Sequence, residues 1–162
     1  MIASRLCLIL LTSAITISLC DLPLGAADAA PAPARKLQGR YDPVSKNGLH
    51  QLALFLAVKF DDDPLPAKAS GLGLAATSWI IQGAGTPPPK DAAAIDANGG
   101  DYVYNTAVSG KRWAEVNHLP VACEKPGFWA DGHVNVLKGD GSIASIKGDF
   151  KTPEEVFKAA SK

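Results

Sequence analysis

The chain has 162 residues, of which 16 are basic and 16 acidic, so its formal net charge at pH 7 is zero. A neutral chain without a basic cluster has no electrostatic means of holding a nucleic-acid backbone or an anionic membrane surface, which disfavours both as partners. The length is sufficient for one domain with a hydrophobic core, and not comfortably for two.

Residues 1–29 have the features of a secretory signal peptide. Arg5 precedes an apolar run from Leu6 to Leu19, and Ala27-Asp28-Ala29 offers a small-residue cleavage site. The run is too short to span a bilayer. We therefore expect cleavage after Ala29, export to the periplasm or the exterior, and no membrane span after cleavage. Two alternatives remain open: lipidation at Cys20, which the large preceding residue disfavours, and retention of an uncleaved segment.

Residues 30–44 contain Ala, Pro, Arg and Lys without a periodic pattern, which predicts a flexible leader. The domain is expected to cover residues 45–162 and to begin with a helix. Ser45 can cap its first turn, and the acidic run 61–63 followed by Pro64 ends it. Between these ends, apolar residues recur at helical spacing: Leu49, Leu52, Ala53, Leu56 and Phe60.

The same helix carries a second apolar strip, formed by Leu54, Phe55 and Val58. A helix that is apolar over more than half its circumference is expected to contact core on more than one side, which predicts a central helix. The alternative is that the strip docks a partner chain.

The middle of the chain gives weaker signals. Residues 70–82 are small and apolar, and they predict either a short helix or an extended loop pinned by Trp79, Ile80 and Ile81. The proline-rich residues 85–89 cannot be regular structure, and residues 90–97 are expected to form one or two helical turns.

Strands are expected at residues 101–106, 119–124, 133–138 and 142–148. The turn Gly139-Asp140-Gly141 lies between alternating apolar residues, which is a strong local sign of an antiparallel hairpin.

The chain is expected to end in a short helix. Thr152 offers a cap, Pro153 suits the first helical position, and Glu155 completes a capping box, with the helix reaching about Ala160. These elements predict an α+β domain, in which one central N-terminal helix packs on a small three- or four-stranded antiparallel β-sheet and a short C-terminal helix follows.

Cys123 is the one cysteine that follows the predicted signal peptide, so the mature chain cannot form an internal disulfide. Its neighbours favour a buried strand position, while pairing with another chain or a reactive thiol are the alternatives. A thiol nucleophile would need His118 or His133 as its base, and no flanking motif supports that arrangement. We expect no catalytic residue and no enzyme activity.

Three carboxylates, Asp131, Asp140 and Asp149, surround the predicted hairpin, and loop carboxylates are ligands that calcium prefers. Their spacing matches no EF-hand, so solvated turns are the simpler interpretation. We expect no cofactor, with calcium at these three residues as the alternative.

Two aromatic residues, Phe128 and Trp129, follow a turn at Pro126-Gly127. Large aromatic side chains are hard to bury in a loop, and their flat apolar faces suit a contact surface. Together with the second apolar strip of the helix, they are the candidate partner-binding residues.

The segment VACEKPGFWADGHVNVLKGDGSI, residues 121–143, resembles the C-terminal end of type II secretion pseudopilin-like proteins with a His-x9-Asp-Gly signature. NGLHQLALFLAVKFDDD at 47–63 and GDYVYN at 100–105 are similar to two further segments in the family's order, so the resemblance spans about residues 46–150. Within 121–143 the matching positions are Glu124, Lys125, Pro126, Gly127, Gly132, Asn135, Val136, Leu137, Asp140 and Gly141.

The chain departs from this family in two places. It has no prepilin cleavage glycine followed by a glutamate in a long apolar helix, and Ala130 stands where the signature histidine is expected, three residues before His133. The resemblance implies a pilin-type head without leader or stalk, exported as a structural or interaction module, with pilin-like or secretion-system proteins as partners. The alternative function is a small exported domain that binds calcium or another ligand and has no assembly role.

Overall fold

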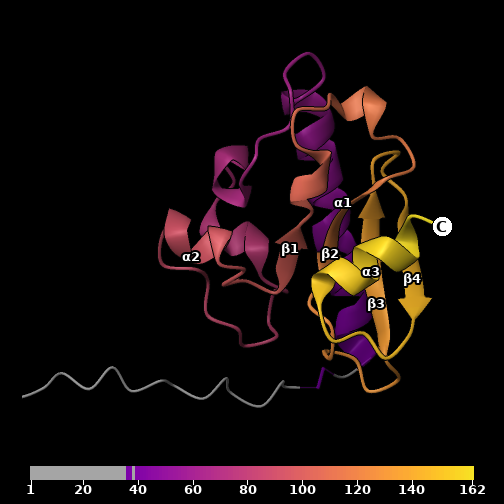
Figure 1. The fold of residues 1–162 in the computed structure, drawn as a ribbon. Coiled ribbons are helices and arrows are strands. Elements are labelled where there is room, and N and C mark those ends of the chain that lie inside the picture. Colours follow the sequence, from indigo (N-terminus) through magenta and orange to yellow (C-terminus); the bar gives the residue numbers. More distant parts are fainter. Residues whose placement is uncertain (1–35, 38) are drawn as a thin grey trace, which may run out of the picture. The chain divides into compact units, whose positions relative to one another are not determined.

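The long helix α1 (Asp42–Lys59) lies against a four-stranded antiparallel sheet (Figure 1). The computed structural model describes residues 36–37 and 39–162. The predicted signal peptide, the lipidation alternative at Cys20 and residues 30–35 of the predicted leader lie outside these ranges. Within them, no helix combines the length and the apolar character needed to cross a membrane.

Helix α1 begins three residues before the predicted start at Ser45, so the predicted boundary was wrong. Asp42 and Pro43 occupy its first turn, where an acid favours the helix dipole and proline has no need of its missing N–H. Ser45 is no cap: it lies inside the helix and is fully buried. The C-terminal end is as predicted, with Phe60 following the last helical residue.

The end of the predicted leader is also part of the packed domain. Leu37 is only 9% exposed, and its backbone N–H donates a hydrogen bond to the Phe128 carbonyl at 2.6 Å. A 3-10 turn, Gly39–Tyr41, then leads into α1. The ordered domain therefore extends upstream of residue 45.

The sheet consists of β1 (Tyr102–Tyr104), β2 (Pro120–Glu124), β3 (His133–Lys138) and β4 (Ile143–Lys147). Its strand order is β1-β2-β3-β4, and each neighbouring pair is antiparallel, so the chain forms a simple meander. All four strands lie within the ranges predicted from the sequence.

The hairpin between β3 and β4 turns where the sequence predicted. Gly141 has φ of +80°, a conformation that glycine adopts without steric cost, and its N–H donates to the Lys138 carbonyl at 3.0 Å. The Asp140 carboxylate accepts a hydrogen bond from the Ser142 N–H at 2.9 Å. The prediction of a turn at 139–141 is therefore confirmed.

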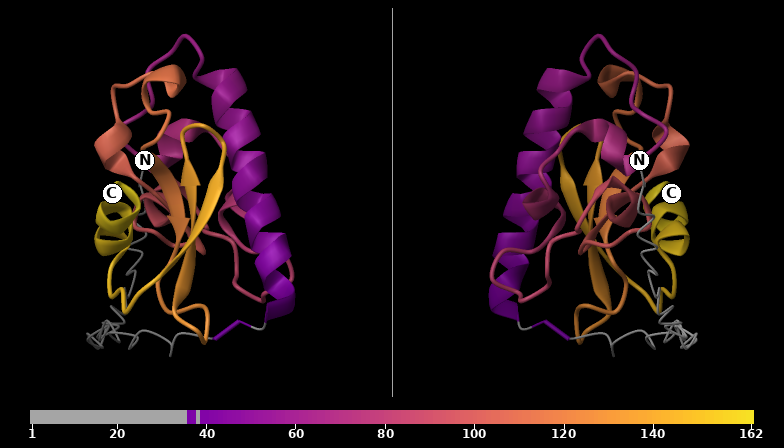
Figure 2. Two further views of the ribbon diagram at one scale, coloured as in Figure 1. Left: turned by 90° about the vertical axis from the view of Figure 1, so that its right-hand side faces the viewer. Right: turned by 90° about the vertical axis from the view of Figure 1, so that its left-hand side faces the viewer.

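Helix α1 covers one face of the sheet and helix α3 (Pro153–Ala160) covers the other, as the two side views show (Figure 2). Alternate residues of a strand point to opposite faces, so Tyr102 and Tyr104 pack toward α1, whereas Val103 packs toward α3. The predicted α+β architecture, with a long helix, an antiparallel sheet and a short C-terminal helix, is thus confirmed. The capping box of Thr152 and Glu155 is present at the start of α3.

Residues 61–100 pass beside β1 at the edge of the sheet (Figure 1). Two 3-10 turns, Ala69–Leu72 and Ala76–Trp79, take the place of the predicted short helix or loop, and α2 (Ala92–Asp96) forms the predicted helical turn. Asp101 anchors this segment, since its N–H donates to the Trp79 carbonyl at 2.6 Å and its carboxylate accepts from the Ile81 N–H at 2.7 Å.

Candidate functional site

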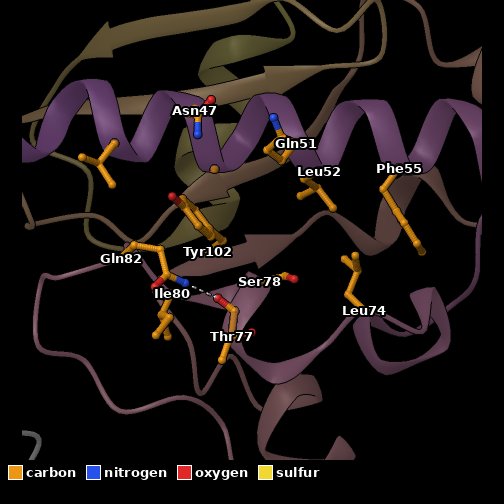
Figure 3. Close-up of a pocket in the computed structure, with 12 residues that line it drawn as sticks. Asn47, Gln51, Leu52, Phe55, Leu74, Thr77, Ser78, Ile80, Gln82 and Tyr102 are labelled. Carbon is orange, nitrogen blue, oxygen red and sulfur yellow. Dashed lines mark hydrogen bonds between the residues drawn. The ribbon is translucent and has the colours of Figure 1, made fainter.

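A groove of about 490 Å³ separates α1 from the segment of residues 74–82 (Figure 3). Its volume falls within the ~300–1,000 Å³ range of small-molecule sites. One wall comes from a single face of α1, the other from the loop, and Tyr102 of β1 lies between them. The lining residues are Val44, Asn47, Gly48, Gln51, Leu52, Phe55, Leu74, Thr77, Ser78, Ile80, Gln82 and Tyr102.

The polar residues of the groove are amides and hydroxyls on facing walls. Asn47 and Gln51 stand one helical turn apart on α1, with Thr77 and Ser78 on the loop opposite. Among the described residues, no hydrogen bond engages the side chains of these four. The Gln82 amide donates to the Thr77 carbonyl at 3.1 Å (Figure 3).

Close packing of α1 on β1 shapes the inner end of the groove. The Tyr102 hydroxyl donates to the Ser45 carbonyl at 3.0 Å, and its ring lies against Gly48. A methyl group at Gly48 would stand 2.4 Å from the Tyr102 oxygen, so only glycine fits this approach. Burial raises the pKa of Tyr102 far above its usual value, so the phenol stays neutral.

The predicted apolar strip of α1 divides into two parts. Leu54 and Val58 are 51% and 85% exposed, whereas Phe55 is half-buried, packs on the core and lines the groove. Three of the four large apolar residues that stand exposed in the described ranges belong to α1: Val44, Leu54 and Val58. The helix therefore presents an uncovered apolar surface next to the groove.

Beneath α1 lies a buried polar network that sequence reasoning did not predict. Glu124, at the end of β2, has no exposed surface. Its carboxylate accepts hydrogen bonds from the Ser45 hydroxyl, from the Trp129 indole N–H at 2.6 Å, and from the Asn135 backbone at 2.8 Å and side chain at 3.0 Å. These bonds join α1, β2, β3 and the loop between the strands. The signal available was a glutamate in an otherwise apolar strand.

The network continues toward the surface through His133, which stands between two carboxylates. Its Nδ1 lies 2.5 Å from Asp131 Oδ1, and its Nε2 lies 3.2 Å from Asp42 Oδ1. Asn135 Nδ2 also donates to Asp42, at 2.8 Å. The hydrogen bond from His133 lowers the pKa of Asp131 to about 2. Burial opposes the charged form of Asp42, but hydrogen bonds from Lys46, Asn135 and His133 outweigh it and lower that pKa too.

Trp129 lies in the core, contrary to the expectation that a loop tryptophan is hard to bury. It is 3% exposed, its N–H is held by Glu124, and its ring stacks on His133 with centroids 4.8 Å apart. A hydrogen-bond partner for the indole N–H is what makes this burial favourable. Phe128 is half-buried and packs against the same core. The preceding turn is present, with Gly127 at φ +87° after Pro126.

The three aspartates considered for calcium are each engaged locally. Asp131 contacts His133 and Lys147, Asp140 binds the turn it belongs to, and Asp149 pairs with Lys151 at 2.6 Å. The part of the chain that the structure describes contains no cluster of three or more potential metal ligands. Calcium binding at these residues stays an untested alternative.

Cys123 is fully buried, as predicted, and faces α3. Val134 lies on the same face of the sheet as Cys123, so His133, its neighbour on β3, lies on the opposite face. Burial, reinforced by the negative charges of Glu124 and Glu154, raises the thiol pKa well above its usual value. Cys123 and His133, one of the two candidate bases, therefore lie on opposite faces of the sheet.

Comparison of the chain with family models, with curated proteins and with solved structures finds no match in any of the three.

Proposed function

We propose that this chain is a non-enzymatic interaction module, exported from the cell, whose docking surface is the exposed apolar part of α1. The observation that carries the proposal is the exposure of Leu54 and Val58, which lie one turn apart on the helix and are 51% and 85% exposed. Contiguous exposed apolar residues commonly mark an interaction site on a soluble domain.

A second helix is the partner that this surface suits best. Val44, Asn47, Gln51, Leu54 and Val58 follow one another at intervals of three and four residues, which is the spacing of a seam between two packed helices. The seam runs along α1 on the side away from the sheet core, because the residues between them, such as Leu49 and Leu56, are fully buried.

The resemblance to pseudopilin heads points to the same kind of partner. It covers about residues 46–150, and a long helix laid on an antiparallel meander is compatible with it. Pilin-type proteins bundle through their helices, so a pilin-like or secretion-system protein is the partner we propose. The expected signal peptide would direct the chain to the periplasm or the exterior, where pilin-like assemblies are located.

Affinity capture in the source cells tests this proposal. We expect tagged chain to co-purify with a protein that mass spectrometry identifies as pilin-type by its long N-terminal apolar helix. The double substitution Leu54→Asp with Val58→Asp should abolish the capture, since it places two charges in the apolar seam. Its thermal stability should stay close to wild type because both side chains are exposed.

A matched control changes the net charge equally at another site. Lys158→Asp on α3 also lowers the charge by two and lies on an exposed position. It should leave the capture intact. Recovery of the same pilin-type protein with the double variant, or recovery of none with the wild type, would refute the proposal.

A further inference from the structure

The groove beside α1 differs from its surroundings in carrying no charged side chain. Of its twelve lining residues none is Asp, Glu, Lys, Arg or His, and the one titratable group, Tyr102, is held neutral by burial. A charged ligand would lose part of its hydration there, and none of the lining residues offers it a counter-ion. The lining therefore selects for an uncharged ligand.

The polar groups of the groove can both donate and accept hydrogen bonds. The amides of Asn47 and Gln51 each offer a donor and an acceptor side by side, and the hydroxyls of Thr77 and Ser78 offer both in one atom. None of the four is used by another described residue. Such groups match a ligand whose own groups are mainly hydroxyls, each of which is also donor and acceptor.

Apolar side chains complete the walls between these polar groups. Leu52, Phe55, Leu74 and Ile80 line the groove, and Phe55 and Leu74 face each other across it (Figure 3). One face of Phe55 is occupied by the Lys59 ammonium, 5.3 Å from the ring centroid. The remaining apolar surface can contact the C–H groups of a ligand that is polar at its edges and apolar on its faces.

A peptide strand is disfavoured by the way the edge of the sheet is covered. Recognition of an extended peptide commonly uses a free strand edge. Here the edge beside the groove is already engaged at its start, because Asp101 bonds Trp79 and Ile81 through its backbone and its carboxylate. At Asp101 the edge is therefore not free to pair with a peptide strand.

We propose that this groove binds a neutral carbohydrate, with the sugar hydroxyls on Asn47, Gln51, Thr77 and Ser78 and its C–H faces on the apolar walls. A volume of about 490 Å³ suits a short oligosaccharide segment. Leu54 and Val58 do not line this groove, whereas Asn47 and Gln51 belong both to the groove and to the helix seam. The test below therefore uses the chain without a partner.

Saturation-transfer NMR on the purified chain tests the proposal with three neutral probes: maltotriose, cellotriose and diacetylchitobiose. We expect at least one of them to bind with a Kd on the order of 1 mM or tighter. Trigalacturonic acid, which is charged, and an uncharged tripeptide amide should give no signal at the same concentration.

Variants on both walls locate the site. Gln51→Ala combined with Thr77→Val removes one polar group from each wall at exposed positions, and it should weaken binding by about tenfold or more. Leu54→Asp with Val58→Asp should bind the sugar as wild type does, which separates this test from that of the docking surface.

Three results would overturn the inference. The first is that none of the neutral saccharides gives a signal. The second is that the Gln51→Ala/Thr77→Val variant binds as tightly as wild type while its melting temperature is unchanged. The third is binding of the acidic saccharide or of the peptide in preference to the neutral sugars.

Discussion

Glu124 connects several parts of the domain through its side-chain hydrogen bonds. Its carboxylate accepts four hydrogen bonds from Ser45, Trp129 and Asn135 and has no contact with solvent. A buried acid is tolerated when every lone pair is satisfied, and losing one partner is costly because the rest remain desolvated. The residue therefore links the helix, two strands and a loop at a single point.

The substitution Glu124→Gln should destabilise the fold by about 2–4 kcal/mol. An amide has two donor hydrogens where the carboxylate had an acceptor, so at least one of the N–H or O–H groups aimed at it would lose its partner. Urea denaturation measures the free energy of unfolding.

Glu154→Gln on α3 is the control for Glu124→Gln, because Glu154 is exposed in the first turn of that helix. It should cost less than about 1 kcal/mol, the typical contribution of an acid near a helix N-terminus. Equal effects of the two substitutions would contradict the assigned role of Glu124.

The acids around His133 predict a pH dependence of stability. The folded-state pKa values of Asp131 and Asp42 are both lowered, that of Asp131 from 3.8 to about 2. A carboxyl with a lowered pKa contributes stability that is present above the unfolded-state pKa and is lost as the pH falls through the folded-state pKa. Stability should therefore fall between about pH 4 and pH 2.

Asp131→Asn should make this fall shallower, because the amide cannot titrate. Denaturation midpoints measured from pH 5 to pH 2 give the comparison. Asp63→Asn, at an exposed residue without an ion-pair partner among the described residues, should keep the wild-type slope. A slope identical in wild type and Asp131→Asn would show that the contact with His133 contributes nothing.

At the scale of elements, α1 approaches β1 closely because Gly48 has no side chain. We expect Gly48→Ala to destabilise the domain by about 1–2 kcal/mol, even though alanine favours a helix over glycine by about 1 kcal/mol. The new methyl group would stand 2.4 Å from the buried Tyr102 oxygen, whose displacement would break its hydrogen bond to the Ser45 carbonyl.

A double-mutant cycle identifies this contact. In a Tyr102→Phe background the oxygen is absent and the nearest remaining ring atom would lie 3.1 Å from the methyl group. Gly48→Ala should then cost less, by about 1 kcal/mol or more, in thermal or urea unfolding. The same cost in both backgrounds would mean that the substitution acts elsewhere.

The sequence predicted best those helices and strands whose ends are marked by a turn or cap motif of a few adjacent residues. β3 has the predicted bounds because its apolar alternation is followed by an Asp-Gly turn, and α3 is defined by the capping box at Thr152. The start of α1 was missed because Asp42-Pro43 was interpreted as part of a proline-rich leader. The correct predictions of β3 and α3 and the wrong start of α1 all depended on how a few adjacent residues were interpreted.

The candidate site could be predicted only in part, because it joins distant residues. Leu54, Phe55 and Val58 were found by helical spacing. Asn47 and Gln51 could have been found in the same way, as two amides one turn apart on the face that ends in Phe55. The opposite wall, residues 74–82, and the bond between Ser45 and Glu124, 79 residues apart, depend on tertiary packing that no local pattern encodes.

At the scale of the whole molecule, one sheet separates two hydrophobic clusters. The cluster toward α1 contains Leu56, and the cluster toward α3 contains Cys123, both fully buried. Because adjacent strand residues contribute to both clusters, we expect the two faces to unfold together. Small domains of this length usually behave in this all-or-none way.

Iodoacetamide labelling of Cys123, followed by site-resolved mass spectrometry, tests this cooperativity. The native thiol should react only through unfolding, because it is buried and its pKa is raised. Leu56→Ala, on the opposite face, should cost about 2–5 kcal/mol and so speed the labelling by roughly 30-fold or more. An unchanged rate would show that α3 opens independently of α1.

The position of Glu124 also has a consequence for how the chain finds its fold. If β2 shifted by one residue against β3, the Glu124 side chain would point to the opposite face of the sheet. It would then lie in the apolar cluster of Val134 and Val136, away from the donors that it binds in the native structure. With α3 packed on that face, a misaligned pairing would bury an unpaired negative charge, which strongly disfavours it. Glu124 therefore favours the native alignment of β2 with β3 over one shifted by a single residue.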